Sequence, residues 1–179
     1  MFKEFLKIMN YIIAEVGAVG VHKKYLNQRT NFNRHIKTIQ AIQKMKMFKG
    51  LDFGSGLCSC LVIGKLLKLD ISGLDIPNTP YLPVQKKLIS MGHKIHIMDT
   101  TQFPWTDFKD DEFEFITFFY SINKQFLNNE KWSMEDRLKE LSRITKKDGA
   151  WFIYPSRHLN LFNRYPKLVK NINIHKWLK

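Results

Sequence analysis

Apolar residues recur at spacings of three and four through the first part of the chain. They form one face of an amphipathic helix that we expect to end between Gly17 and Gly20, and its members are Phe2, Phe5, Leu6, Met9, Ile12, Ile13 and Val16. A second helix is expected from about Asn31, with an inward face of Phe32, Ile36, Ile39 and Ile42. Residues 1–45 are therefore predicted to be a helical prefix that packs on a core, with a lid or membrane-surface role as the alternative.

From Met47 onward, short apolar runs alternate with helical patterns. The predicted strands are Met47–Phe53, Ile71–Ile76, Lys94–Asp99, Phe113–Ser121 and Ala150–Tyr154, and "NINIHKW" near the end is a candidate last strand. The predicted helices between them are Cys58–Leu69, Leu82–Met91 and Met134–Lys146, with one more before the last strand. Ser133 and Asp136 resemble a capping box for the helix from Met134, and Asp148-Gly149 is typical of the turn that ends it.

The order of these elements predicts the fold class. Strands that alternate with helices are typical of parallel sheets covered by helices on both faces. The predicted strands are nearly continuous apolar runs, as strands buried on both faces should be. We therefore expect an α/β protein with a doubly wound, mostly parallel sheet in three αβα layers. The 179 residues suit a single domain, 1–179, made of the prefix 1–45, a core 46–155 and a basic C-terminal segment 156–179.

Composition bears on the cellular location of the protein and on membrane and metal binding. No apolar run approaches the roughly 20 residues that a membrane span requires, and Glu4, Asn10 and Glu15 interrupt the apolar start that a signal peptide would need. The two cysteines, Cys58 and Cys60, are too close in sequence for a structural disulfide and too few for a zinc site. We expect a cytoplasmic protein with no membrane span and no metal.

The net charge of +13 is concentrated at the two ends of the chain. Residues 1–50 hold ten basic and two acidic residues, residues 156–179 hold six basic and none acidic, and the middle is almost neutral. Basic flanks favour an anionic partner such as a phosphorylated metabolite, a lipid headgroup or a nucleic acid. The alternative is generic surface charge, because 23 of the 29 basic residues are lysines.

Three successive predicted strands end in aspartate. Asp52 closes the first and is followed by the turn Gly54-Ser55-Gly56, while Asp75 and Asp99 close the second and third. In an open parallel sheet the ligand binds outside the carboxyl ends of the strands. Three acids in register beside a glycine turn favour a ligand with several hydrogen-bond donors, such as a ribose diol and a positively charged amine.

The motifs in order resemble those of class I S-adenosylmethionine-dependent methyltransferases, closest to the small-molecule, type 11-like group. The segments that carry the resemblance are "LDFGSGLC", "GLDIP", "MGHKIHIMDTTQFPW", "DDEFEFITFFYSI" and "LKELSRITKKDGAWFI", which cover about residues 47–155. The resemblance implies a Rossmann-like fold in which 46–155 is a cofactor-binding core, and it implies S-adenosyl-L-methionine as the cofactor.

The resemblance also implies roles for particular residues. Asp52, Gly54, Ser55 and Gly56 would line the methionine part of the cofactor, and Asp75 would accept hydrogen bonds from the ribose hydroxyls. Asp99 and the backbone of Thr100 would hold the adenine amine, and Ile76 would contact the adenine face. Phe119 and Tyr120 match a stretch that faces both cofactor and acceptor, with strand core as the alternative for Phe118 and Phe119.

A nicotinamide cofactor is the main competitor for the glycine turn. Asp75 lies at the distance that the dinucleotide fingerprint requires, but Ser59 stands where its third glycine belongs. Asp52 and Asp99 are not needed for that reading. Against the methyltransferase pattern G-x-G-x-G, Cys58 replaces the last glycine, and we interpret it as a small buried residue rather than a nucleophile.

Two departures bear on activity. "TFFYSIN" lacks the Asn/Asp-Pro-Pro-aromatic motif of DNA-amine methyltransferases, and about 25 residues follow Tyr154 where the family adds two strands. A shortened end leaves three hypotheses: a minimal enzyme, a sheet edge completed by an oligomer, or cofactor binding without efficient transfer. No catalytic base is assigned. The rim candidates are His22, Tyr11, Tyr25, Tyr120, Asn123, Tyr154 and His158.

The sequence thus predicts a methyltransferase whose acceptor is a small molecule or an RNA, with an anionic acceptor favoured. The first alternative is a basic nucleic-acid-binding protein with a vestigial cofactor site. The residues that would contact phosphates are Arg29, Arg34, Lys23 and Lys24, with Lys167, Lys170 and Lys176 of the tail. The second is an enzyme that uses S-adenosylmethionine without transferring methyl.

Overall fold

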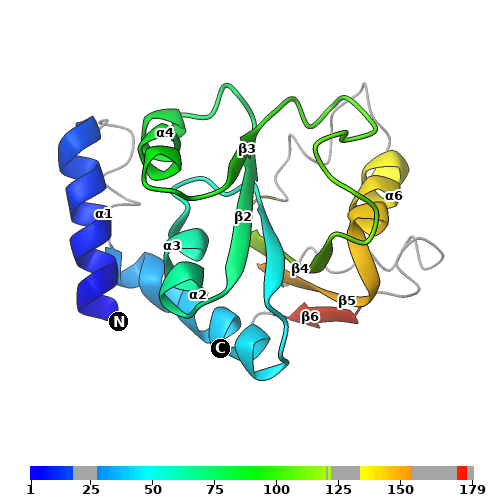
Figure 1. Cartoon of the computed structure of the whole chain (residues 1–179), viewed down its shortest axis with the longest axis horizontal. Helices are drawn as coiled ribbons and strands as arrows, with labels where there is room; N and C mark the ends of the chain where they lie inside the picture. The colour runs from blue at the N-terminus through cyan, green and yellow to red at the C-terminus, as the bar shows by residue number, and fades with distance from the viewer. Residues whose placement is uncertain (18–27, 120, 122–133, 155–172, 177–179) are drawn as a thin grey trace.

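The sheet that organises the molecule has six strands, all parallel, in the order β3-β2-β1-β4-β5-β6. It is seen in a computed structural model that describes residues 1–17, 28–119, 121, 134–154 and 173–176 (Figure 1). The strands are β1 Lys49–Phe53, β2 Asp70–Asp75, β3 Ile95–Ile97, β4 Phe113–Phe119, β5 Thr145–Tyr154 and β6 Asn173–Lys176. The prediction of a mostly parallel sheet is confirmed, and every described pairing is parallel.

Helices cover both faces of this sheet, as the sequence predicts. They are α1 Phe2–Val16, α2 Gln28–Lys44, α3 Ser59–Leu66, α4 Leu82–Ser90 and α6 Met134–Ile144. One apolar cluster joins α2, α3 and α4 to one face of the sheet, for example Ile39 and Ile63 to Phe115. A second cluster joins α6 and the segment around Trp105 to the other face, where Leu141 packs with Trp151. Figure 1 shows α1 to α4 on one side of the strands and α6 on the other.

The prefix helix α1 packs on other helices rather than on the sheet. Its inward residues Phe5, Met9 and Ile12 are fully buried, which confirms the predicted apolar face. The ring of Phe32 on α2 lies 5.3 Å from the ring of Phe5. Lys87 on α4 pairs with Glu15 at 3.2 Å. The first helix therefore forms an outer layer over α2 and α4.

The boundary between α6 and β5 differs from the prediction. The helix ends at Ile144 rather than Lys146, and the strand begins at Thr145 instead of Ala150. The Thr145 hydroxyl donates to the Leu141 carbonyl at 2.6 Å and accepts from Trp151 Nε1 at 2.9 Å, so a buried side chain fixes the strand's start. The predicted turn at Asp148-Gly149 is a bulge within β5. The register of β4 with β5 shifts between the pairs Phe113/Thr145 and Phe115/Ala150, and Asp148 has a φ of 62°.

The other predicted elements are present with small shifts. The second helix begins at Gln28 rather than near Asn31, and β3 is three residues long, so that Asp99 lies beyond it. The candidate last strand is present as β6. Ser133 and the helix predicted before β6 lie outside the described residues. None of the described helices is long and apolar enough to cross a bilayer.

Candidate cofactor site

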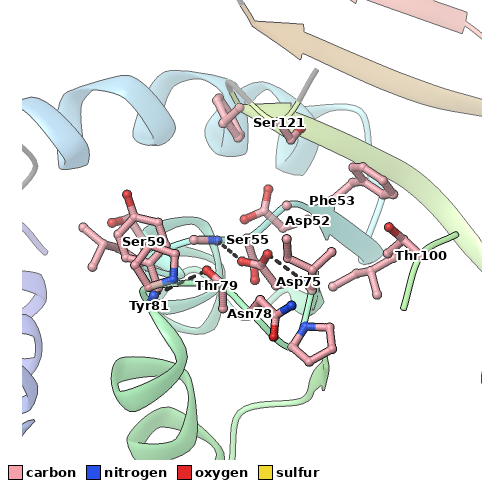
Figure 2. A pocket seen from close by; sticks show the side chains of 18 of the residues that line it. Asp52, Phe53, Ser55, Ser59, Asp75, Asn78, Thr79, Tyr81, Thr100 and Ser121 are labelled. Carbon is pink, nitrogen blue, oxygen red and sulfur yellow. Dashed lines mark hydrogen bonds between the residues drawn. The ribbon is translucent and has the colours of Figure 1, made fainter. Parts of the chain in front are cut away.

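A cavity of about 970 Å³ opens at the carboxyl ends of β1, β2 and β4. Nine of the ten residues predicted from sequence to bind a cofactor line it: Asp52, Gly54, Ser55, Gly56, Asp75, Ile76, Asp99, Thr100 and Phe119. The tenth, Tyr120, lies outside the described residues. Figure 2 shows Asp52 and Asp75 side by side in the middle of this cavity, with Ser121 and Thr100 at its rim. The three strand-end acids are thus brought to one space.

The glycine turn after β1 forms the floor of the cavity. Gly54 and Gly56 have positive φ angles of 70° and 50°. The amides of Gly54 and Ser55 both donate to the carbonyl of Leu74, at 2.8 and 3.1 Å, which ties the turn to β2. A Cβ on Gly54 would lie 2.5 Å from the Cβ of Ser121. Glycine at position 54 is therefore required both by its φ and by the close approach of the chain after β4.

Asp75 holds this turn through its carboxylate. Oδ2 accepts from the Gly56 amide at 2.8 Å and Oδ1 accepts from the Ile76 amide at 2.9 Å (Figure 2). Oδ2 also accepts from Nε2 of Gln85 at 2.8 Å. A carboxylate has about four lone-pair sites, so one site, on Oδ1, stays available to a ligand. Asp75 is therefore both a support of the loop and a candidate ligand-binding group.

Gln85 on α4 is the residue that links the turn to the acid. Its side chain is fully buried, and Nε2 donates to the Gly56 carbonyl at 3.0 Å as well as to Asp75. Sequence reasoning did not single it out, because an isolated glutamine on a helix carries no pattern of its own. Its position opposite Asp75 follows only from the packing of α4 on the sheet.

Asp52 is a buried acid with an unusual proton affinity. It is 2% exposed and accepts from the Thr117 hydroxyl at 2.7 Å. Burial raises the pKa of Asp52 to about 7, the hydrogen bond from Thr117 opposes this shift, and the nearby Asp75 charge adds to it. The free protein therefore exchanges a proton at Asp52 near neutral pH, and a cation in the cavity would favour the ionised form.

Asp99 differs from the other two acids because it is exposed. Oδ1 accepts from the Thr101 amide at 2.9 Å, which makes the turn that follows β3. Oδ2 is 3.3 Å from Nε2 of Gln102. Ile76, which directly follows β2, is 40% exposed, so an apolar surface lies in the same cavity as this carboxylate.

Several lining residues were not predicted as part of a cofactor site, among them His35, Arg137 and Ser121. Arg34 also lines it, whereas the sequence placed it only in the alternative phosphate-binding surface. The sequence contains a pattern that indicates burial of His35 and Arg137. His35 follows Phe32 by three residues, and Arg137 precedes Leu141 by four, so both polar side chains stand on the buried face of an amphipathic helix.

The remaining site predictions have mixed outcomes. Cys58 is fully buried with a φ of 57° at the start of α3, which confirms its interpretation as a small buried residue. Phe118 is core, while Phe119 is partly buried and lines the cavity. Of the candidate bases, Tyr11 and Tyr154 are described and neither lines the cavity. The other five lie outside the described residues. No cluster of metal-ligating side chains occurs in the described parts of the chain.

The donor and acceptor set of the cavity fits S-adenosylmethionine. Carboxylates suit the ribose hydroxyls and the cationic amine, Ile76 offers an apolar face, and the backbone of the turn can be approached closely because Gly54 and Gly56 have no side chain. Arg34 lines the same cavity and has the charge that the methionine carboxylate requires.

No known family profile and no curated protein sequence matches this chain. Solved structures do. The amino pentose methyltransferase CalS10 from Micromonospora echinaspora, described as bound to S-adenosylmethionine, matches with a TM-score of 0.55 and 17% identity over 74% of this chain and 55% of its own.

Two further structures match to a similar degree. The PH0226 protein from Pyrococcus horikoshii OT3 has a TM-score of 0.52 and 16% identity over 74% of this chain and 60% of its own. An S-adenosylmethionine-dependent methyltransferase from Clostridium acetobutylicum has a TM-score of 0.52 and 14% identity over 72% of this chain and 52% of its own. This chain therefore spans between half and two thirds of these proteins. Its structure has the Rossmann-like fold of class I S-adenosylmethionine-dependent methyltransferases.

Proposed function

We propose that this chain is an S-adenosylmethionine-dependent methyltransferase. The observation that carries the proposal is the single cavity in which Asp52, Asp75 and Asp99 meet the glycine turn. The fold alone would not carry it, because one fold serves many functions. The chemistry of the lining residues is what separates a methionine-bearing nucleoside from other ligands.

The nucleoside lies along β2 and β3 in this proposal. Asp75 accepts one ribose hydroxyl at the free lone pair of Oδ1, since its other sites are taken by Gly56, Ile76 and Gln85. Asp99, beyond β3, and the backbone of Thr100 bind the adenine amine. The exposed side chain of Ile76 lies against the adenine ring.

The methionine part lies over the glycine turn. Asp52 faces the ammonium group, and Gly54, Ser55 and Gly56 allow the chain to approach it. Arg34 pairs with the carboxylate, because α2 packs beside α3 and the turn leads directly into α3. Phe119 at the end of β4 borders the sulfonium, and Tyr120, next in the chain, stays a prediction.

When bound, S-adenosylmethionine would supply a methyl group activated by the positively charged sulfur; the acceptor would take this methyl group and lose its proton to solvent, and S-adenosylhomocysteine would be left. The residues of this chain contribute alignment, which is the main demand of an in-line displacement. They also supply a cavity in which buried carboxylates act with little screening by water. No residue is assigned as a general base.

Transfer of a tritiated methyl group from S-adenosylmethionine to a metabolite extract tests the activity. The extract is divided into a small-molecule fraction and an RNA fraction. We expect label in the small-molecule fraction with wild type and none with Asp75→Ala. Label found only in the RNA fraction would mean that the acceptor is an RNA rather than a small molecule. Cofactor binding without any labelled product would contradict methyl transfer as the function.

A further inference from the structure

The β4 side of the cavity holds polar groups that the cofactor assignment does not use. Arg137 on α6, the His35 ring on α2 and Ser121 after β4 all line it. The two helices belong to opposite faces of the sheet, because α2 packs in one apolar cluster and α6 in the other. This side of the cavity is therefore built by converging elements rather than by one loop.

Arg137 is a charged side chain placed in a nearly dry position. It is 4% exposed, although it stands on a helix whose neighbouring residues Glu135 and Asp136 are exposed. Burial lowers the pKa of the Arg137 guanidinium below its usual range. A buried guanidinium is stabilised strongly by an oxyanion that can meet its planar donors.

Two uncharged polar side chains on this side each have a buried atom with no hydrogen-bond partner in the described structure. Nδ1 of His35 and Oγ of Ser121 are buried and make no hydrogen bond. The His35 ring meets the Phe119 ring edge to face at 4.2 Å, which places it at the end of β4. Burial, with a smaller effect of Arg34, lowers the pKa of His35 to about 3, so the imidazole is neutral at physiological pH. Buried polar atoms are normally hydrogen-bonded, so these two point to a ligand.

We propose that the β4 side of the cavity is the acceptor subsite, and that it takes a small acceptor whose carboxylate or phosphate group lies against Arg137. The inference rests on the proposed methyltransferase function. Ser121 and the neutral ring of His35 hydrogen-bond the rest of the acceptor. A small acceptor is favoured over a polymer because Arg137 lies inside the cavity, whereas exposed cations such as Lys37 do not line it.

The first experiment tests whether Arg34 binds the cofactor's carboxylate while Arg137 does not contact the cofactor. The wild type, Arg34→Gln and Arg137→Gln are titrated with S-adenosylhomocysteine and with 5′-methylthioadenosine, which has neither carboxylate nor ammonium. We expect Arg34→Gln to lower the affinity for S-adenosylhomocysteine at least tenfold and the affinity for methylthioadenosine less than twofold. Arg137→Gln should change both by less than threefold. A tenfold loss of S-adenosylhomocysteine affinity in Arg137→Gln would assign Arg137 to the cofactor and overturn the inference.

The second experiment measures anion binding to the full chain saturated with S-adenosylhomocysteine, with benzoate and inorganic phosphate as probes. Arg137→Gln should weaken the better-bound probe at least tenfold, while Lys37→Gln, which removes the same charge from the surface, should change it less than twofold. Equal losses in both variants, or no loss in Arg137→Gln, would overturn the subsite. A chain that binds no S-adenosylhomocysteine would instead refute the proposed function.

Arg137→Lys and Ser121→Ala keep the test decisive if Arg137→Gln does not fold. Lysine retains the charge but loses the planar fork of donors. We expect each of these variants to weaken the probe about threefold while S-adenosylhomocysteine affinity and melting temperature stay close to wild type. Unchanged probe binding in both variants counts against the subsite.

Discussion

Nε2 of Gln85 lies 2.8 Å from Oδ2 of Asp75 and 3.0 Å from the carbonyl oxygen of Gly56. One buried amide thus joins α4, the end of β2 and the glycine turn. Asp75 and the glycine turn are therefore parts of a single hydrogen-bonded unit. A change in one should therefore alter the other.

Gln85→Met tests this coupling, because methionine has a similar volume but no donors. The change leaves Asp75 Oδ2 and the Gly56 carbonyl each short of one hydrogen bond. We expect the free energy of unfolding to fall by about 1–3 kcal/mol and S-adenosylhomocysteine affinity to fall about tenfold. Urea denaturation and calorimetry measure the two effects. Gln40→Met, at an exposed site on α2, is the control and should change neither; full affinity in Gln85→Met would show that the turn needs no such support.

Asp52 should make cofactor binding depend on pH. Its raised pKa of about 7 in the free protein means that the ionised form, which attracts the ligand's ammonium, is depleted below neutrality. If binding requires the ionised form, S-adenosylhomocysteine affinity should rise roughly tenfold from about pH 6 to pH 8. Calorimetry at several pH values measures this, and Asp52→Asn should give a flat profile. If the affinity of wild type and of Asp52→Asn changes with pH in the same way, Asp52 does not bind the ammonium group.

The same group has a signature in stability. The pKa of Asp52 is higher in the folded state than in the unfolded chain, so between about pH 4 and pH 7 the folded state binds more protons. The contribution of Asp52 to the free energy of unfolding therefore decreases as pH rises through that range. Asp52→Asn should remove this decrease and be more stable than wild type at pH 8, which denaturant melts can detect.

Gly54 and Gly92 form a matched pair for a test of the close approach to Ser121. Both have positive φ, 70° and 80°, but a Cβ on Gly92 would meet nothing nearer than Lys65 Nζ at 3.9 Å. Gly92→Ala should cost about 1 kcal/mol from backbone strain. Gly54→Ala should cost clearly more, because its Cβ would lie 2.5 Å from that of Ser121. Denaturant melts compare the losses of unfolding free energy in the two variants. Equal losses would mean that Ser121 moves away from the added Cβ without an energetic cost.

Cys58 and Cys60 should be chemically inert in the folded protein. Both are fully buried, and burial raises the pKa of each thiol above its usual range. We expect no reaction with a thiol reagent such as dithionitrobenzoate in buffer and two equivalents in denaturant. Rapid modification of the native protein, with loss of S-adenosylhomocysteine binding, would instead identify a reactive thiol beside the glycine turn.

The local parts of the fold and site could be predicted from sequence. Asp52 lies one residue before the end of β1, and Asp75 is the last residue of β2, as expected from apolar runs that stop at an acid. The glycine turn follows from two glycines spaced by one residue. Parallel strands bring their carboxyl ends together, so the meeting of the three acids required no further information. The apolar face of α1 is equally local.

Features that depend on packing between distant segments could not be predicted. Thr145 starts β5 early because its hydroxyl reaches Leu141 and Trp151, and no pattern in the sequence indicates that contact. Gln85 reaches Asp75 only after α4 docks. His35 and Arg137 interrupt apolar helix faces, which signals polar burial, but only the folded chain shows that both line one cavity.

A calorimetric titration of the wild type and Asp75→Ala tests the central claim most directly. Asp70→Ala is the control, because Asp70 stands at the opposite end of β2 in an exposed pair with Lys94. We predict that S-adenosylmethionine and S-adenosylhomocysteine bind one site, that NAD does not, and that Asp75→Ala weakens both ligands at least tenfold, about 1.4 kcal/mol, while Asp70→Ala leaves them unchanged. Affinity that is unaltered in Asp75→Ala, or tight binding of NAD, would contradict the account.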